Sequence, residues 1–264
     1  MKDADILYAF FVTLQADELS AREILVLAAP FGITETNVRS ALSRMHARDV
    51  IAVRKQGRTA FYRRGGRGRR IGANVARHFH EPDWSGWDGT YWAAAFSQPD
   101  SKIRHRLQKK LLAYRFRALY PGVWIRPRHP VEKIEETFAD FLGRNGFDLL
   151  CGDFVKEPSR ERIAGLYGLH RTGKDLRTML RTVRRSGAAV SSLSPKAAFV
   201  HWLRTGDSIV KTLMSDPLLP PSLLPPRWPG TELRRAFKRW NALCEKRSAP
   251  FVREALHPRK RGGK

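Results

Sequence analysis

The stretch FGITETNVRSALSRM, residues 31–45, decides the first part of the fold. Its apolar residues recur at the spacing of one helical face, so we expect a helix with an apolar stripe packed against a core. Thr34 stands where an N-cap residue belongs, two positions after Gly32. The opposite flank of this helix is polar and contains arginine. The apolar stripe is Val38, Ala41, Leu42 and Met45.

The segments on either side complete a recognisable order of elements. Two helices are expected before residue 31, one over residues 5–15 and one begun by the capping-box pair Ser20 and Glu23. After residue 45, the β-prone runs VIAVRK and RTAFYRR flank a glycine-containing turn and predict a hairpin. A helix-turn-helix followed by a hairpin is the order of a winged helix.

The charge of the chain points to a polyanionic partner. Lys and Arg total 49 against 25 Asp and Glu, a formal charge of +24. Between Arg39 and Arg77 the chain has twelve basic residues and one acid, Asp49. A solvated basic surface is the alternative explanation, but this concentration beside a helix-turn-helix favours nucleic acid.

The second helix of a helix-turn-helix enters the major groove of DNA, and the wing contacts phosphates nearby. Asn37 suits bidentate pairing with adenine, and Arg39 or Arg44 suits guanine or phosphate. A motif used only for packing or protein contact is the alternative. The residues that we expect to contact DNA are Thr34, Thr36, Asn37, Arg39, Ser40, Ser43, Arg44, Arg54, Lys55 and Arg58.

The next two segments predict further domains. GGRGRR, residues 65–70, has no periodicity, and we expect a linker or flexible basic arm there. Residues 85–156 read as strand, helix, strand, strand, helix and strand, the order of a ferredoxin-like α/β sandwich. The fold class is therefore α+β and multidomain, with a winged helix over residues 1–80. The expected central elements are strand 90–96, helix 101–114, the hairpin strands around Pro121 and Gly122, helix 131–146 and strand 147–155.

The third segment, residues 157–264, is predicted to be helical. Helical patterns cover residues 160–186, 194–214 and 231–256. DPLLPPSLLPPRWPG, residues 216–230, has six prolines, so it must lie extended on the surface or wrap a neighbouring element. The tail HPRKRGGK is basic, and we expect it to be disordered.

Other classes of protein fit the sequence poorly. No apolar run reaches the ~18 residues of a membrane span, and the first helix carries Asp3 and Asp5 where a signal peptide has none. The cysteines, Cys151 and Cys244, stand alone and predict neither a disulfide nor zinc. We expect a cytoplasmic protein without cofactor or metal, since His78 and His80 are only a weak pair of ligands.

Two further groups of residues are candidate sites. Asp100 and Asp153 follow predicted strands and are the metal-holding candidates for a nuclease, but Asp100 is better explained as a helix cap, so we predict no enzymatic activity. Trp92 and Trp124 fall on adjacent strands and are candidates for an effector cleft. Packing in the core is the preferred interpretation of both.

Three motifs in order resemble one family. LAAPFGITETNVRSALSRMHARDVIAVRKQGRTAFY resembles the winged helix of the PaaX family of bacterial repressors of phenylacetate catabolism and their relatives. YPGVWIRP resembles its central domain and DPLLPPSLLPPRWPG its C-terminal signature. The resemblance implies a homodimeric transcriptional regulator on double-stranded DNA, with a Cas2-like central domain, released from its operator by an aryl- or acyl-CoA thioester.

Two other functions remain open from sequence. A non-specific nucleic-acid binder, or a metal-dependent nuclease using the Cas2-like domain, would also need the basic surface. A protein-interaction scaffold would dock a partner on the proline-rich run. The leucines and tryptophan within that run favour packing on its own protein instead.

Overall fold

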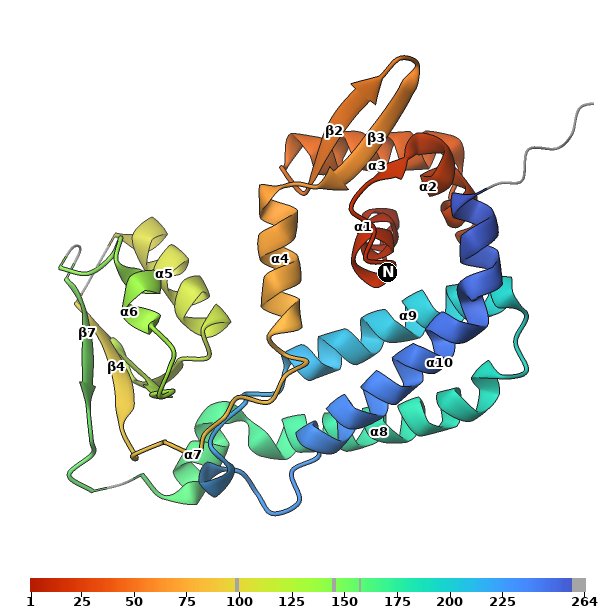
Figure 1. Ribbon diagram of the computed structural model, residues 1–264. Helices are drawn as coiled ribbons and strands as arrows, with labels where there is room; N and C mark the ends of the chain where they lie inside the picture. Colours follow the sequence, from red (N-terminus) through yellow and green to blue (C-terminus); the bar gives the residue numbers. More distant parts are fainter. Residues whose placement is uncertain (98–99, 144–145, 157, 258–264) are drawn as a thin grey trace, which may run out of the picture. The chain divides into compact units, whose positions relative to one another are not determined.

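The computed structural model describes residues 1–97, 100–143, 146–156 and 158–257, and it combines helices with two antiparallel sheets (Figure 1). It contains two compact units. The first comprises Met1–His80, Leu176–Ser215 and the chain from Pro229, and the second comprises Glu81–Asp175 and Asp216–Trp228. These units group elements by contact, so the domain limits at residues 80, 85, 156 and 157 remain predictions.

The first unit begins with a winged helix, as predicted. Its sheet is antiparallel with strand order β1-β3-β2, and β1 is a two-residue strand that the sequence did not predict. A helix, a short strand, two helices and a hairpin follow one another in the winged-helix order. The elements are α1 (Asp3–Thr13), β1 (Leu19–Ser20), α2 (Ala21–Ala28), the 3-10 helix η1 (Ala29–Phe31), α3 (Glu35–Ala47), β2 (Ile51–Gln56) and β3 (Thr59–Arg64).

Capping hydrogen bonds set the ends of α2 and α3. The Ser20 Oγ accepts from the Glu23 N–H at 3.2 Å, and the Glu23 carboxylate accepts from the Ser20 N–H at 2.6 Å. This confirms the predicted capping box. Gly32 follows η1 with φ 74°, a left-handed conformation that turns the chain toward α3. Thr34 then caps α3 as predicted.

The Gly/Arg run is not a linker, and that prediction was wrong. Residues Gly66–Ala76 form the helix α4. The carboxylate of Asp49 accepts the N–H groups of Gly66 and Arg67, at 3.1 and 3.0 Å, and so satisfies donors at the first turn of α4. The helix therefore depends on an acid 17 residues earlier in the chain, which local periodicity does not detect.

The glycines of this run are required by close approach of backbone. A Cβ on Gly65 would lie 2.5 Å from the Asp49 carbonyl oxygen. A Cβ on Gly68 would lie 2.1 Å from the Val50 carbonyl oxygen, and the Gly68 carbonyl accepts from the Tyr8 hydroxyl at 2.6 Å. The start of α4 therefore packs directly on the chain between α3 and β2.

The helices that follow the central domain belong to both units, since the second unit runs to Asp175 and the first resumes at Leu176. The helix expected over residues 160–186 is two helices, α7 (Arg160–Tyr167) and α8 (Leu169–Val190), because Gly168 adopts φ 60° between them. The helices α9 (Pro195–Met214) and α10 (Gly230–Leu256) form as expected.

An aromatic cluster joins the winged helix to these helices. The ring of Phe199, on α9, lies 5.9 Å from the rings of both Phe10 and Phe31 and 5.2 Å from that of Phe251 on α10. These centroid distances are those of packed aromatic pairs. The turn before α3 is thus part of the same core as α9 and α10.

The second unit contains the predicted ferredoxin-like sandwich. Its sheet has the order β5-β6-β4-β7 with every neighbouring pair antiparallel, which is the ferredoxin-like arrangement. The expected helix over residues 131–146 is much shorter, since α6 ends at Phe138, and its proposed stop at Asn145 lies outside the described residues. The elements are β4 (Tyr91–Phe96), α5 (Ser101–Ala113), β5 (Arg117–Tyr120), β6 (Val123–Pro127), α6 (Ile134–Phe138) and β7 (Phe147–Gly152).

The proline-rich run packs on its own protein, one of the two outcomes expected from its composition. Leu219 and Leu223 are buried with Tyr91 and Ile125 of the sheet, and η2 (Pro221–Leu223) is a single 3-10 turn. The Trp228 Nε1–H donates to the Asp216 carboxylate at 3.2 Å and closes the segment. The tail that is predicted to be disordered, residues 257–264, lies outside the described part of the chain except for His257.

The close approach at Gly68 predicts that Gly68→Ala destabilises the protein by about 1–3 kcal/mol, because the new methyl group must push α4 off the Val50 carbonyl. The measurement is the midpoint of urea unfolding. Gly165→Ala is the matched control, since its Cβ meets nothing within 4 Å and should stabilise α7 by about 0.5–1 kcal/mol. Equal effects of the two substitutions would contradict the packing described for α4.

Candidate nucleic-acid interface

The polar flank of α3 is open to solvent, while its apolar stripe is buried. Val38, Ala41, Leu42 and Met45 are at most 5% exposed. The Thr34 Oγ1 accepts from the Asn37 N–H at 3.3 Å, so this hydroxyl is engaged in capping. The predicted flank residues are all exposed, and they are Thr34, Thr36, Asn37, Arg39, Ser40, Ser43 and Arg44.

Arg39 and Arg44 of α3 each contact a side chain one turn earlier in the helix. Arg39 forms an ion pair with Glu35 one turn earlier, and Arg44 donates to the Ser40 hydroxyl. Both are surface interactions between residues at i and i+4, which contribute at most about 1 kcal/mol. A phosphate or a guanine edge can replace them at little cost, so both side chains stay available to a ligand.

Two of the predicted cations of the wing are exposed at its tip, and the third forms an ion pair with Glu18. Lys55 and Arg58 are exposed at the tip, where Gly57 has φ 57° in the two-residue turn. Arg54 is different, because its Nε and Nη2 donate to the two carboxylate oxygens of Glu18 at 3.2 and 2.6 Å. Hydrogen bonding from the Arg54 side chain lowers the pKa of the Glu18 carboxyl group. Arg54 therefore ties the wing to the chain before β1.

The arginines of α4 lie on the surface of a folded element, which the Gly/Arg composition of residues 65–70 did not predict. Arg67 and Arg70 are exposed, and helical spacing places both away from the buried Gly68. Arg69 is also exposed and donates to the Arg64 carbonyl at 2.9 Å. The basic surface thus continues from the hairpin onto the first turns of α4.

Asp49 lies at the junction of α3, β2 and α4. Hydrogen bonds from the backbone N–H groups of Arg67 and Gly66 lower the pKa of its carboxyl group, and the charges of Arg70 and Arg69 lower it further. Its backbone has φ 54°, which is uncommon for a residue other than glycine. The one acid in the basic stretch is therefore a structural cap.

The acidic candidates of the central domain do not converge. Asp100 caps α5, accepting from the N–H groups of Lys102 and Ile103 at 2.8 and 3.4 Å, which confirms its capping role. Asp153 follows Gly152, which pairs with Tyr91 at the opposite end of β4. The two ends of this strand are about 17 Å apart. Over the described residues, no group of three or more His, Cys, Asp or Glu side chains is placed to hold a metal ion.

The two candidate tryptophans lie on adjacent strands, as expected. Trp124 is 9% exposed in a cluster with Phe116 and Phe138, and Trp92 packs against the same cluster. These surroundings agree with the preferred core role, and an effector role for either residue stays a prediction.

His78, one of the two weak candidates for a metal ligand, is buried with its Nδ1 3.0 Å from the Asn74 carbonyl oxygen. Among the described helices, none has the length and apolar character needed to cross a bilayer.

Comparisons with known proteins agree across the chain. A PaaX-like protein model matches residues 6–68, the PaaX protein central Cas2-like domain matches residues 85–164, and the PaaX-like protein C-terminal domain matches residues 167–254. The transcriptional repressor PaaX of Escherichia coli (strain K12) is 22% identical over 245 residues, which cover 87% of this chain and 75% of that protein.

A solved structure shares the fold. The uncharacterized protein Rv0674 from Mycobacterium tuberculosis matches with a TM-score of 0.59 at 24% identity, covering 87% of this chain and 89% of that one. At this identity the likeness concerns the fold alone.

The hydrogen bonds at Asp49 predict a pH-dependent stability. Because the folded-state pKa is lowered, the carboxylate stabilises the fold above its ordinary pKa, about 3.9, and this contribution disappears as the pH falls through the folded value. Asp49→Asn should therefore lower the urea midpoint at pH 7, and the difference from wild type should shrink in acid. Asp17→Asn, at an exposed carboxylate of the same unit, is the control. A deficit for Asp49→Asn that is equal at all pH values would exclude the ionised cap.

Proposed function

Because the chain belongs to the PaaX-like family, we propose that it is a sequence-specific DNA-binding regulator that represses transcription. The observation that carries the proposal is the exposed polar flank of α3 beside a basic wing. Burial of that flank against the protein itself would have excluded this role. The repressor name of the Escherichia coli relative supports the proposal at 22% identity.

In the proposed complex, α3 lies in the major groove and the wing lies over the neighbouring backbone. A major groove about 12 Å wide admits a helix, and side chains near its N-terminus reach the base edges. The candidates for base contacts are then Thr36, Asn37, Ser40 and Arg44. Lys55 and Arg58 contact phosphates, and Arg54 holds the wing in position through Glu18.

The finer parts of the proposal follow the family resemblance. The regulator acts as a homodimer on a pseudo-palindromic operator in the cytoplasm, and an aryl- or acyl-CoA thioester relieves repression. It has no enzymatic activity. Hydrolysis of DNA with magnesium or manganese that is lost in Asp100→Ala would contradict this last point.

A second candidate, non-specific binding of nucleic acid, is favoured by the charge of +24 alone. Competition separates the two. A gel shift on the DNA upstream of the chain's own gene should resist excess random duplex and should be reversed by one member of a panel of CoA thioesters. Equal competition by random and specific duplex would establish the second candidate.

The residues proposed to contact DNA are tested by comparing the affinity of each variant for operator duplex and for random duplex. Asn37→Ala or Arg44→Ala should cost about 1–3 kcal/mol on the operator and relax specificity, because each removes a contact to a base edge. Arg58→Ala should weaken binding to all sequences about equally, since it removes a phosphate contact. Fluorescence anisotropy at fixed salt measures all three, and identical effects on both duplexes for every variant would reject this choice of residues.

We expect the exposed arginines of α4 to contact additional phosphates. If Arg67 and Arg70 each meet one phosphate, the double variant Arg67→Ala/Arg70→Ala should reduce the slope of log affinity against log salt by about 1.8 per subunit. Arg181→Ala/Arg185→Ala, which removes two exposed arginines from α8, is the control with the same change of charge. An unchanged slope in the α4 variant would place these arginines outside the complex.

A further inference from the structure

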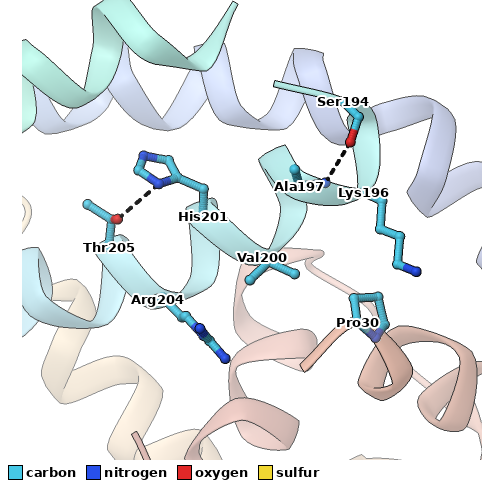
Figure 2. A pocket seen from close by; sticks show the side chains of 8 residues that line it. All are labelled: Pro30, Ser194, Lys196, Ala197, Val200, His201, Arg204 and Thr205. Carbon is cyan, nitrogen blue, oxygen red and sulfur yellow. Dashed lines mark hydrogen bonds between the residues drawn. The ribbon is translucent and has the colours of Figure 1, made fainter. Parts of the chain in front are cut away.

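A groove open to solvent, with a volume of about 610 Å³, lies beside the helix-turn-helix between Pro30 of η1 and one face of α9. Figure 2 shows its lining, with Val200 between Lys196 and Arg204 on successive turns of α9 and Pro30 across from them. This volume lies within the usual range of small-molecule sites. The lining residues are Pro30, Ser194, Lys196, Ala197, Val200, His201, Arg204 and Thr205.

The chemistry of this groove is cationic at its ends and apolar in its middle. Lys196 and Arg204 are eight residues apart on one helical face, which separates their Cα atoms by about 12 Å. His201 is engaged by hydroxyl groups at both ring nitrogens, Ser186 at 2.6 Å and Thr205 at 3.5 Å. None of the eight described lining residues carries a carboxylate.

A neighbouring groove is less suited to an anion. It has a volume of about 580 Å³ and shares Ser194 and Lys196 with the first groove, but Glu254 also lines it and offsets the charge of Arg22, the second cation there. A carboxylate at that position repels a second negative charge. The distribution of charge therefore selects the groove at Pro30.

We propose that this groove binds an elongated, amphipathic anion. Its phosphate or carboxylate groups pair with Lys196 and Arg204, and its apolar part lies along Pro30, Ala197 and Val200. Charge-assisted hydrogen bonds to ammonium and guanidinium groups supply affinity, and burial of the apolar part adds to it. This ligand is a small molecule, and DNA bound by α3 and the wing contacts other residues.

The position of the groove connects it to DNA reading. Pro30 precedes Phe31, whose ring packs 6.0 Å from Phe10 and 5.9 Å from Phe199. The Arg204 guanidinium lies over the same ring at 5.9 Å from its centroid. A ligand that draws Arg204 away, or that presses on Pro30, alters the packing of the turn that leads into Thr34 and α3.

This regulatory consequence rests on the proposed function, because it requires that α3 reads DNA. A ligand shifts the balance only if it binds one arrangement of the turn better than the other. The ligand of this groove is then the effector, and its binding is coupled to release of the operator. Binding itself does not depend on DNA and is tested without it.

Isothermal titration of the full chain tests the groove directly. The probes are phenylacetyl-CoA, coenzyme A and phenylacetate, which separate phosphate from carboxylate and each from the apolar group. Lys196→Ala/Arg204→Ala should raise the Kd of the bound probe at least about tenfold, because two charge-assisted contacts are lost. Val200→Trp, which fills the groove and keeps both cations, should weaken the same probe comparably.

The control is again Arg181→Ala/Arg185→Ala, which lowers the net charge equally and should leave the Kd within about twofold. Groove variants that bind the probe as the control does would overturn the proposal and place the ligand elsewhere. Failure of the wild-type chain to bind any of the three probes would overturn it as well. The gel shift on operator DNA, performed on the same samples without probe, shows separately whether the regulator proposal stands.

Discussion

The polar flank of α3 is exposed because four apolar residues on the opposite side of the helix are buried. Val38, Leu42 and Met45 each gain about 1.5–3 kcal/mol from leaving water, and Ala41 lets α3 approach its neighbours closely. Because a helix has a fixed period, turning this stripe inward turns Asn37, Arg39 and Arg44 outward. The packing of the apolar stripe therefore determines which side chains of α3 are available to contact DNA.

One cap begins α3, and a second, just after its end, begins α4. Thr34 begins α3, and Asp49, two residues after its end, begins α4 by accepting the N–H groups of Gly66 and Arg67. One carboxylate in a strongly basic stretch thus anchors a helix that carries further arginines. Replacing it with a neutral group would loosen the element that extends the cationic surface beyond the wing.

The helix-turn-helix is also continuous with the C-terminal helices. Phe31, in the turn, and Phe199, on α9, belong to one aromatic cluster, so the turn cannot move without a change in the packing of α9. The groove at Pro30 opens on this contact. A site for a small anion at such a position provides a physical route from ligand to DNA without a contact between the two.

The sequence by itself determined the features that local chemistry controls. The stripe of α3, the capping box of Ser20 and Glu23, the order of strands and helices in residues 85–156 and the packing of the proline-rich leucines all follow from period, caps and composition. Long-range contacts decided the rest. The Gly/Arg run became α4 only because Asp49 and the Val50 carbonyl meet it, and Arg54 was engaged by Glu18 from a distant segment. The groove between η1 and α9 joins residues more than 160 positions apart, so only the tertiary structure brings Pro30 together with Lys196 and Arg204.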